Sequence, residues 1–160
     1  MAVPTFYLQT SVWGSLAPRQ PRDRKNAVLR LLKKLDGVRG QGVVSALVKD
    51  EINAAGPQVT EPIKLRLIKA SPLIAKTSGE VETLALAYVH SGVVSPRRIN
   101  DAFHVATATV AGCTYLVSWN HRHMTRPAVK LLYQQVNMTQ GYDWTPLICN
   151  PLEACNELRS

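Results

Sequence analysis

Residues 95–118 read SPRRINDAFHVATATVAGCTYLVS, a stretch in which a helix pattern passes directly into a strand pattern. Ser95 followed by Pro96 is a helix-start signal, because serine can cap a helix and proline suits its first turn. Tyr115–Ser118 is a short apolar run, typical of a strand buried on both faces. Between them, apolar residues recur at the three- and four-residue spacing of one helix face that ends at Gly112: Ile99, Ala102, Phe103, Ala106 and Val110.

The same succession of helices and strands extends in both directions from this stretch. Further strands are expected at Phe6–Thr10, Gly42–Ser45 and Leu147–Cys149. Further helices are expected at Asp23–Leu35, Ala46–Ala55, Glu61–Ala70 and Pro127–Val136, with another that is capped by Thr77 and ends near Gly92. Strands separated by helices predict an α/β fold, namely a three-layer α/β/α sandwich with a central parallel sheet of four to five strands.

Length and composition indicate one hydrophobic core. The 160 residues, 46% of them hydrophobic, fit a single domain over residues 1–160 that needs no disulfide or structural metal. The N-terminal sequence lacks a basic region followed by a long apolar stretch, and no apolar run reaches the roughly 18 residues of a membrane span. The expected location is therefore the cytoplasm.

The cysteines argue against a disulfide scaffold and against a thiolate metal site. Cys113, Cys149 and Cys155 are odd in number and lack the CxxC spacing of zinc or thioredoxin-like sites. We therefore expect ordinary thiols. Any metal site in this chain is expected to use oxygen ligands instead.

The chain is strongly basic. Lysine and arginine exceed aspartate and glutamate by 19 to 11, which gives a formal net charge of +8 and favours a polyanionic partner through phosphate contacts and counterion release. The largest concentration comprises Arg19, Arg22, Arg24, Lys25, Arg30, Lys33, Lys34 and Arg39, and smaller groups comprise Arg97 with Arg98, and Arg122 with Arg126 and Lys130. These residues can form a solvated helix face or a nucleic-acid footprint, and the sequence leaves both interpretations open.

Polar side chains stand at the carboxyl ends of the expected strands, where open parallel sheets bind ligands. Gln9 closes the first strand, and Asn120 follows the strand quoted above. Glu51 lies one to two turns into the helix after the second strand, and Asp101 lies in the first turns of the helix quoted above. These four residues are far apart in sequence but are expected to converge in such a fold.

Two carboxylates and two side-chain amides form an oxygen donor set suited to Mg²⁺ or Mn²⁺. Such an ion can hold a scissile phosphate, lower the pKa of a bound water and stabilise the leaving oxygen. The four residues therefore predict metal-dependent hydrolysis of a phosphodiester, without a nucleophilic side chain.

Each of these residues also has a purely structural interpretation. Asp101 can stabilise a helix N-terminus by its negative charge, Glu51 can be an exposed helix residue, and Asn120 can be a turn former. Gln9 differs, because an amide at the end of an apolar strand needs hydrogen-bond partners if it is buried. His104 lies beside the apolar stripe of its helix and is expected to be a satisfied packing residue rather than a base or a metal ligand.

Four motifs, in chain order, resemble those of the PIN-domain family, whose bacterial members include VapC-type toxins. The motifs are FYLQTSV at 6–12, VSALVKDEI at 44–52, NDAFHVATA at 100–108 and LVSWN at 116–120. The third is similar to the family's Asp-Ala-(apolar)-His-(apolar)-Ala-x-Ala helix. The fourth ends where the family has an aspartate or, in one branch, an asparagine.

The resemblance implies a parallel sheet between helices, a Mg²⁺ or Mn²⁺ site, cleavage of RNA, a homodimer and, for the toxins, a small antitoxin partner. It implies that Glu51 and Asp101 are metal ligands and that Asn120 is a weaker ligand or orients a water. The hydroxyl of Ser118 is expected to support these groups without touching the metal.

At Gln9 the chain departs from the family, which ordinarily has an aspartate in that position. A unit charge pair about 4 Å apart is worth on the order of 4 kcal/mol at an effective dielectric of about 20, before desolvation is subtracted. The glutamine carbonyl can still coordinate, but its side chain is uncharged and one methylene longer. The leading hypothesis is therefore a PIN-like, metal-dependent endoribonuclease whose activity is reduced at Gln9.

Two rival hypotheses follow from the same residues. The first is a non-catalytic PIN-like module that binds RNA or a protein through the basic rim. The second is a metal-dependent nuclease or phosphatase that acts on other phosphates.

Overall fold

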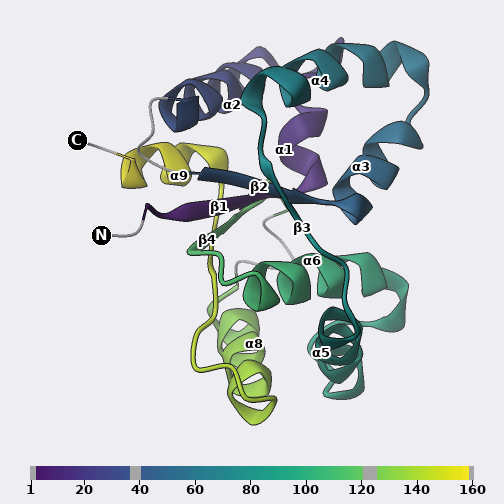
Figure 1. Cartoon of the computed structure of the whole chain (residues 1–160), viewed down its shortest axis with the longest axis vertical. Coiled ribbons are helices and arrows are strands. Elements are labelled where there is room, and N and C mark those ends of the chain that lie inside the picture. The colour runs from purple at the N-terminus through teal and green to yellow at the C-terminus, as the bar shows by residue number, and fades with distance from the viewer. Residues whose placement is uncertain (1–2, 37–40, 121–125, 159–160) are drawn as a thin grey trace.

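The computed structural model describes residues 3–36, 41–120 and 126–158. Its centre is an all-parallel sheet in the order β3-β2-β1-β4-β5 (Figure 1). In the central strand, Tyr7 pairs with Val43 on one side and with Leu116 on the other. The strands are β1 (Thr5–Leu8), β2 (Gln41–Ser45), β3 (Leu73–Ala75), β4 (Tyr115–Val117) and β5 (Leu147–Cys149).

Helices cover both faces of this sheet (Figure 1). One layer contains α1 (Thr10–Gly14), α2 (Arg22–Lys34), α3 (Ala46–Asn53), α4 (Pro57–Ala70) and α9 (Pro151–Glu157). The other layer contains α5 (Gly79–His90), the 3₁₀ turn η2 (Pro96–Arg98), α6 (Ile99–Val110) and α8 (Pro127–Thr139). The predicted three-layer α/β/α sandwich with a parallel sheet is confirmed.

The neighbouring strands β1 and β4 are buried because a helical layer covers each face of the sheet. Phe6, Tyr7 and Leu8 of β1 are at most 1% exposed, and Leu116 and Val117 of β4 are fully buried. This burial explains why both strands read as continuous apolar runs in the sequence. The residues just beyond the carboxyl ends of these strands are therefore the first polar groups at that edge of the sheet.

The start of α1 differs from the sequence prediction. The first strand ends at Leu8 rather than Thr10, because Gln9 already acts as the N-cap of α1. This short helix was not predicted. Its presence turns the chain sharply at the point where the candidate site begins.

Two helix caps were also predicted wrongly. Ser78, not Thr77, caps α5, since the Ser78 hydroxyl accepts a hydrogen bond from the backbone N–H of Val81 at 3.4 Å. Ser95 makes no side-chain cap, because it precedes η2 and α6 begins only at Ile99.

Three further differences lie toward the edges of the fold. α4 begins at Pro57, before the predicted Glu61, because proline is favoured in a first helical turn. The edge strand β3 was not predicted, and its Leu73 and Ile74 are each 57% exposed. The C-terminal helix α9 was not predicted either.

Among residues 3–36, 41–120 and 126–158, no helix combines the length and the apolar character that crossing a membrane requires. The three cysteines are free thiols, and all three are buried. Burial raises the pKa of the Cys113 thiol to about 11 and that of Cys149 to about 12.

Candidate functional site

Gln9 lies at the carboxyl end of β1 and is 7% exposed. Its backbone N–H donates to the carbonyl of Val117 at 3.1 Å, so the residue stays bonded to the end of β4. Its side-chain Oε1 accepts hydrogen bonds from the backbone N–H of Ser11 at 2.9 Å and from the Ser118 hydroxyl at 3.2 Å. The buried amide is therefore satisfied, as its position in the sequence required.

These bonds cross the topological switch point of the sheet. The chain leaves β1 for helices of one layer and reaches β4 from helices of the other, and ligands bind preferentially at such a point. Ser11 Oγ accepts from the backbone N–H of Trp119 at 2.9 Å. Ser118 Oγ accepts from the backbone N–H of Asn120 at 2.9 Å and lies 3.3 Å from Ser11 Oγ. The segments after β1 and β4 thus form one hydrogen-bonded unit.

Glu51 lies in the second turn of α3, and its side chain is 27% exposed. Its Oε1 accepts from the Thr10 hydroxyl at 2.6 Å and lies 2.7 Å from Nε2 of His104. Burial alone would raise the pKa of Glu51, but hydrogen bonds from His104 and Thr10, with a smaller one from Asn100, outweigh it and hold the pKa below its usual value. The carboxylate therefore favours its ionised form.

His104 is fully buried and satisfied, as predicted, but its partners were not foreseen. Its Nδ1 lies 2.7 Å from the hydroxyl of Tyr7, which lies 2.8 Å from Ser45 Oγ. Burial raises the pKa of Tyr7 far above its usual value. His104 thus connects the core of the sheet to Glu51, a contact that no local pattern in the sequence indicates.

Asp101 lies in the first turn of α6 and lines a pocket of about 490 Å³. Arg97 and Arg98 of η2 line the same pocket, together with Arg126 at the start of α8. Two basic groups that are separate in sequence therefore meet beside one of the predicted site residues. Burial raises the pKa of Tyr133 at this pocket well above its usual value, and the Asp101 charge adds to the effect.

The four predicted site residues all belong to the carboxyl-end edge of the sheet. Gln9 is joined to the segment of Asn120 through Ser118, and it directly precedes Thr10, the hydroxyl donor to Glu51. Asp101 lies at the start of α6, which runs back toward the start of β4 and therefore begins at the same edge. The contact of Asn120 with this unit is made by its backbone N–H.

Two of the predicted donor oxygens already accept hydrogen bonds from the protein. Oε1 of Gln9 already accepts two hydrogen bonds, and the other polar atom of its amide, Nε2, is a donor. Oε1 of Glu51 likewise has two partners. Within residues 3–36, 41–120 and 126–158, no group of three or more His, Cys, Asp or Glu side chains could hold a metal ion.

Two basic residues of α2 make contacts within the protein. The Arg24 guanidinium lies 4.9 Å above the centre of the Trp119 ring, and Lys34 Nζ donates to the carbonyl of Cys155 at 3.0 Å. These two residues therefore stabilise the fold locally. Arg39 and Arg122 lie outside the described residues.

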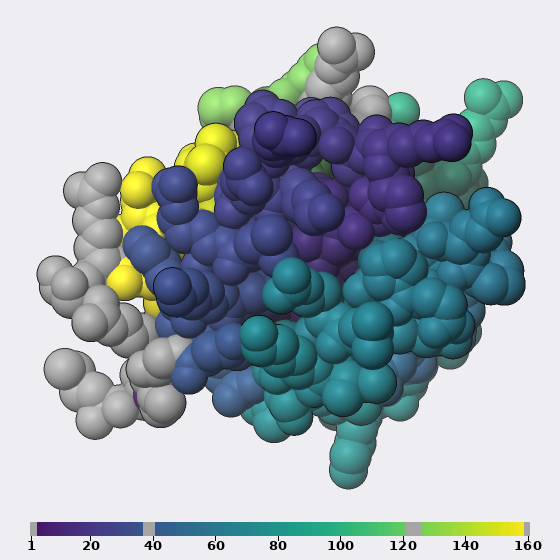
Figure 2. Space-filling view, turned by 90° about the horizontal axis from the view of Figure 1, so that it is seen from above, coloured from purple at the N-terminus to yellow at the C-terminus, as the bar shows by residue number. Residues whose placement is uncertain are grey.

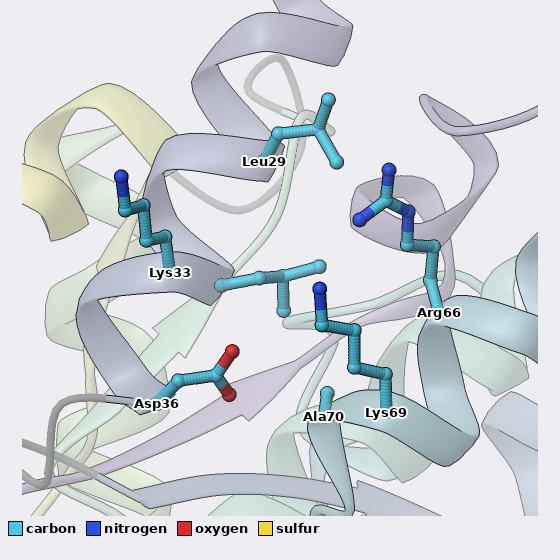
Figure 3. A pocket seen from close by; sticks show the side chains of 7 residues that line it. Leu29, Lys33, Asp36, Arg66, Lys69 and Ala70 are labelled. Atoms are coloured by element: carbon cyan, nitrogen blue, oxygen red, sulfur yellow. The ribbon is translucent and has the colours of Figure 1, made fainter.

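A second basic hollow lies between α2 and α4, on the face that Figure 2 shows from above. It has a volume of about 300 Å³. Figure 3 shows the side chains of Lys33, Arg66 and Lys69 around it, with Leu29 and Asp36 on the α2 side. None of the four predicted site residues lines this hollow.

No protein-family model matches the chain, and no curated protein matches it. Among solved structures, the chain is similar to one chain of the crystal structure of VapBC2 from Rickettsia felis bound to a DNA fragment from their promoter. The match has a TM-score of 0.53 and 16% sequence identity, and it covers 91% of this chain and 98% of that chain. At this identity the similarity shows a shared fold, so the chain has the α/β/α architecture of that VapBC2 chain.

Proposed function

We propose that the chain is a PIN-like protein of the VapC toxin type that binds RNA at the carboxyl edge of its sheet and cleaves it weakly, because Gln9 replaces a carboxylate. The fold shared with a VapBC2 chain and the four motifs in chain order support this proposal. The observation that carries it is the engagement of Gln9 Oε1 by Ser11 and Ser118. An oxygen that already accepts two hydrogen bonds is a poor additional ligand for a cation.

The proposed reaction is hydrolysis of an RNA phosphodiester. Glu51 and Asp101 would hold a Mg²⁺ or Mn²⁺ ion, with Asn120 as a weaker ligand or an orienter of water. When bound, such an ion would activate a water and stabilise the leaving oxygen. Thr10 and His104 would fix the Glu51 carboxylate in place through their hydrogen bonds.

The arginine pocket beside Asp101 supports RNA as the substrate. Arg97, Arg98 and Arg126 line it together, and guanidinium groups bind phosphate oxygens through paired hydrogen bonds. A phosphate held there would place the adjoining part of the RNA backbone next to the Asp101 carboxylate. The formal net charge of +8 favours the same partner.

The proposed protein partner is a small antitoxin, and the proposed location is the cytoplasm. The similar chain was solved in VapBC2 bound to promoter DNA, and the PIN-family resemblance implies both an antitoxin and a homodimer. Co-expression with a neighbouring reading frame, followed by co-purification, tests this part of the proposal separately from catalysis.

The decisive test replaces Gln9 with aspartate. Q9D should bind Mn²⁺ more tightly than the wild type and should cleave RNA faster, and the added substitution Asp101→Asn should abolish both gains. Gln58→Asp is the matched control, because it makes the same chemical change at an exposed position of α4. If Q9D and Gln58→Asp behave alike in both assays, the proposed metal site is wrong.

The non-catalytic module remains the second candidate, and the same engaged Gln9 carbonyl favours it. In that case the wild type binds RNA without turnover, and Asp101→Asn leaves binding unchanged. A panel of RNA, DNA and phosphomonoester substrates given to Q9D separates an endoribonuclease from an enzyme that acts on other phosphates.

A further inference from the structure

A continuous chain of hydrogen bonds runs from the interior of the sheet to Glu51. It passes from Ser45 Oγ to the Tyr7 hydroxyl at 2.8 Å, from there to His104 Nδ1 at 2.7 Å, and from His104 Nε2 to Glu51 Oε1 at 2.7 Å. Ser45, Tyr7 and His104 are at most 2% exposed. Water therefore has little access to these groups, so each of their protons must be donated to another member of this hydrogen-bond chain.

The last link of the chain determines the proton on His104 Nε2. A carboxyl group is ordinarily ionised at neutral pH and then only accepts hydrogen bonds. Glu51 Oε1 also receives the hydroxyl proton of Thr10 at 2.6 Å. A bare Nε2 lone pair 2.7 Å from this oxygen would be repelled by it, so Nε2 must donate.

The remaining links then have one consistent direction. In a neutral imidazole with hydrogen on Nε2, Nδ1 is an acceptor, so Tyr7 must donate to it. The Tyr7 oxygen can then accept the proton of Ser45, whose oxygen already accepts the backbone N–H of Val48 at 3.3 Å. In this arrangement each O–H or N–H group of the hydrogen-bond chain donates to an atom that can accept it.

The alternative with a charged imidazolium is less favourable. Nδ1 would then donate to Tyr7, and Tyr7 would donate to Ser45, whose oxygen also accepts from Val48. The Ser45 proton would be left without an acceptor among these groups, and the ion pair of the imidazolium with Glu51 would not restore that bond. Leaving a buried hydroxyl proton without an acceptor costs free energy.

We propose that His104 is a positioning residue in the neutral Nε2–H form, oriented by Tyr7 and Ser45, and that its single donated hydrogen bond, together with that of Thr10, fixes the direction of the Glu51 carboxylate. The role of Glu51 as a metal ligand rests on the proposed function. The direction of the hydrogen bonds from Ser45 to Glu51 does not. His104 in α6 and Glu51 in α3 belong to the two helical layers on either side of the sheet (Figure 1). The bond therefore also fixes the two layers relative to each other at the site.

The first experiment reads the proton positions in the unmodified protein. Long-range ¹H–¹⁵N correlation spectra of histidine-labelled protein near neutral pH separate the two neutral tautomers from the imidazolium. The chain has four histidines, and the signals missing from a His104→Gln sample identify His104. An Nε2–H tautomer is expected, and an Nδ1–H tautomer or an imidazolium overturns the proposal.

The second experiment separates positioning from packing by two substitutions made in the Q9D background. Gln can place an amide N–H near the position of Nε2, whereas Asn reaches only as far as Nδ1. His104→Asn should weaken Mn²⁺ binding by about 10- to 100-fold, the usual effect of losing a group that orients a metal ligand. His104→Gln should retain most of the affinity.

The outcomes distinguish the two proposals. If Q9D binds no Mn²⁺ but His104 is the Nε2–H tautomer, the proposed function is wrong and the direction of the hydrogen bonds from Ser45 to Glu51 is confirmed. If Q9D binds Mn²⁺ and the folded His104→Asn variant binds it equally well, the positioning role is overturned. If His104→Asn does not fold, Tyr7→Phe in the Q9D background takes its place, and unchanged Mn²⁺ affinity there is equally contrary to the proposal.

Discussion

Oε1 of Gln9 accepts a hydrogen bond from the Ser118 hydroxyl at 3.2 Å, between the ends of the neighbouring strands β1 and β4. The two residues are 109 positions apart in sequence, and both are buried. Ser118 Oγ also accepts the backbone N–H of Asn120. One hydroxyl thus links the end of β1 to the turn after β4, and this gives Gln9 a structural role whether or not a metal binds.

Replacing Ser118 with alanine should destabilise the protein. The change removes one of the two donors to Gln9 Oε1 and leaves the Asn120 N–H without its acceptor, and a polar group left unpaired in the interior costs about 1–3 kcal/mol. Urea denaturation followed by circular dichroism measures the free energy of unfolding. Ser91→Ala, at an exposed serine after α5, should change it by less than about 0.5 kcal/mol. Equal effects of the two variants would show that the Ser118 bonds contribute nothing.

Removing the three arginines of the Asp101 pocket should weaken RNA binding. The triple alanine variant at Arg97, Arg98 and Arg126 is expected to bind single-stranded RNA less tightly. Its plot of log affinity against log salt concentration should be shallower by about 0.7 for each phosphate contact that is lost. Fluorescence anisotropy at several salt concentrations provides both values.

The control for this prediction is a triple alanine variant at Lys64, Arg66 and Lys69 of α4. It makes the same change in net charge in the opposite helical layer. A purely nonspecific effect of charge would lower affinity and salt slope equally in the two variants, and that result would contradict a phosphate site beside Asp101.

The stability contributed by Glu51 should depend on pH in one direction. Burial raises its pKa, but the hydrogen bonds of His104 and Thr10 hold the folded-state pKa below the usual value of 4.5. The ionised folded form is thus favoured, and its contribution is present above the unfolded-state pKa and is lost as the pH falls through the folded-state value.

Thermal unfolding between pH 7 and pH 3 tests this dependence. The melting temperature of the wild type should exceed that of Glu51→Gln by most at pH 6–7, and the difference should shrink as the pH falls below about 4.5. Glu61→Gln, at an exposed position of α4, is the control. A difference between wild type and Glu51→Gln that grows with acidity would show that the sign is wrong.

Asn137 should be among the polar residues on which stability depends most. It is fully buried in α8, accepts from the Tyr88 hydroxyl, and donates to Thr145 Oγ1 at 3.0 Å and to the Trp144 carbonyl at 3.3 Å. Asn137→Leu removes all of these bonds, and the loss of a buried polar partner costs about 1–3 kcal/mol. Urea denaturation should show a much larger loss than for Asn53→Leu, at an exposed position of α3.

The sequence predicts the central strands and most helices because their signals are local. β1 and β4 read as apolar runs since both of their faces are covered, and the amphipathic stripe of α2 is visible in Ala27, Val28 and Leu31. β3 escapes prediction because it has only three residues and two of its side chains are exposed. Its strand character comes from pairing with β2 and not from its own composition.

The same distinction applies to the candidate site. Gln9, Glu51, Asp101 and Asn120 can be predicted from the sequence as candidates, since each follows a strand or lies in the first two turns of a helix at the carboxyl edge. Their joint role in metal binding stays a prediction. The bonds that fix them cannot be found in this way. Tyr7 and His104 are 97 positions apart, and a tyrosine in an apolar strand gives no local sign that its hydroxyl contacts a histidine.

The central place of β1 in the sheet has a consequence for synthesis of the chain. β1 pairs with β2, whose last residue is Ser45, but its other side pairs with β4, which begins at Tyr115. On the ribosome, β1 therefore has an open edge of unpaired backbone groups until Tyr115–Val117 has been made. Open edges of this kind pair readily with other chains. Protection of the nascent protein by a chaperone should matter most during the interval before β4 emerges.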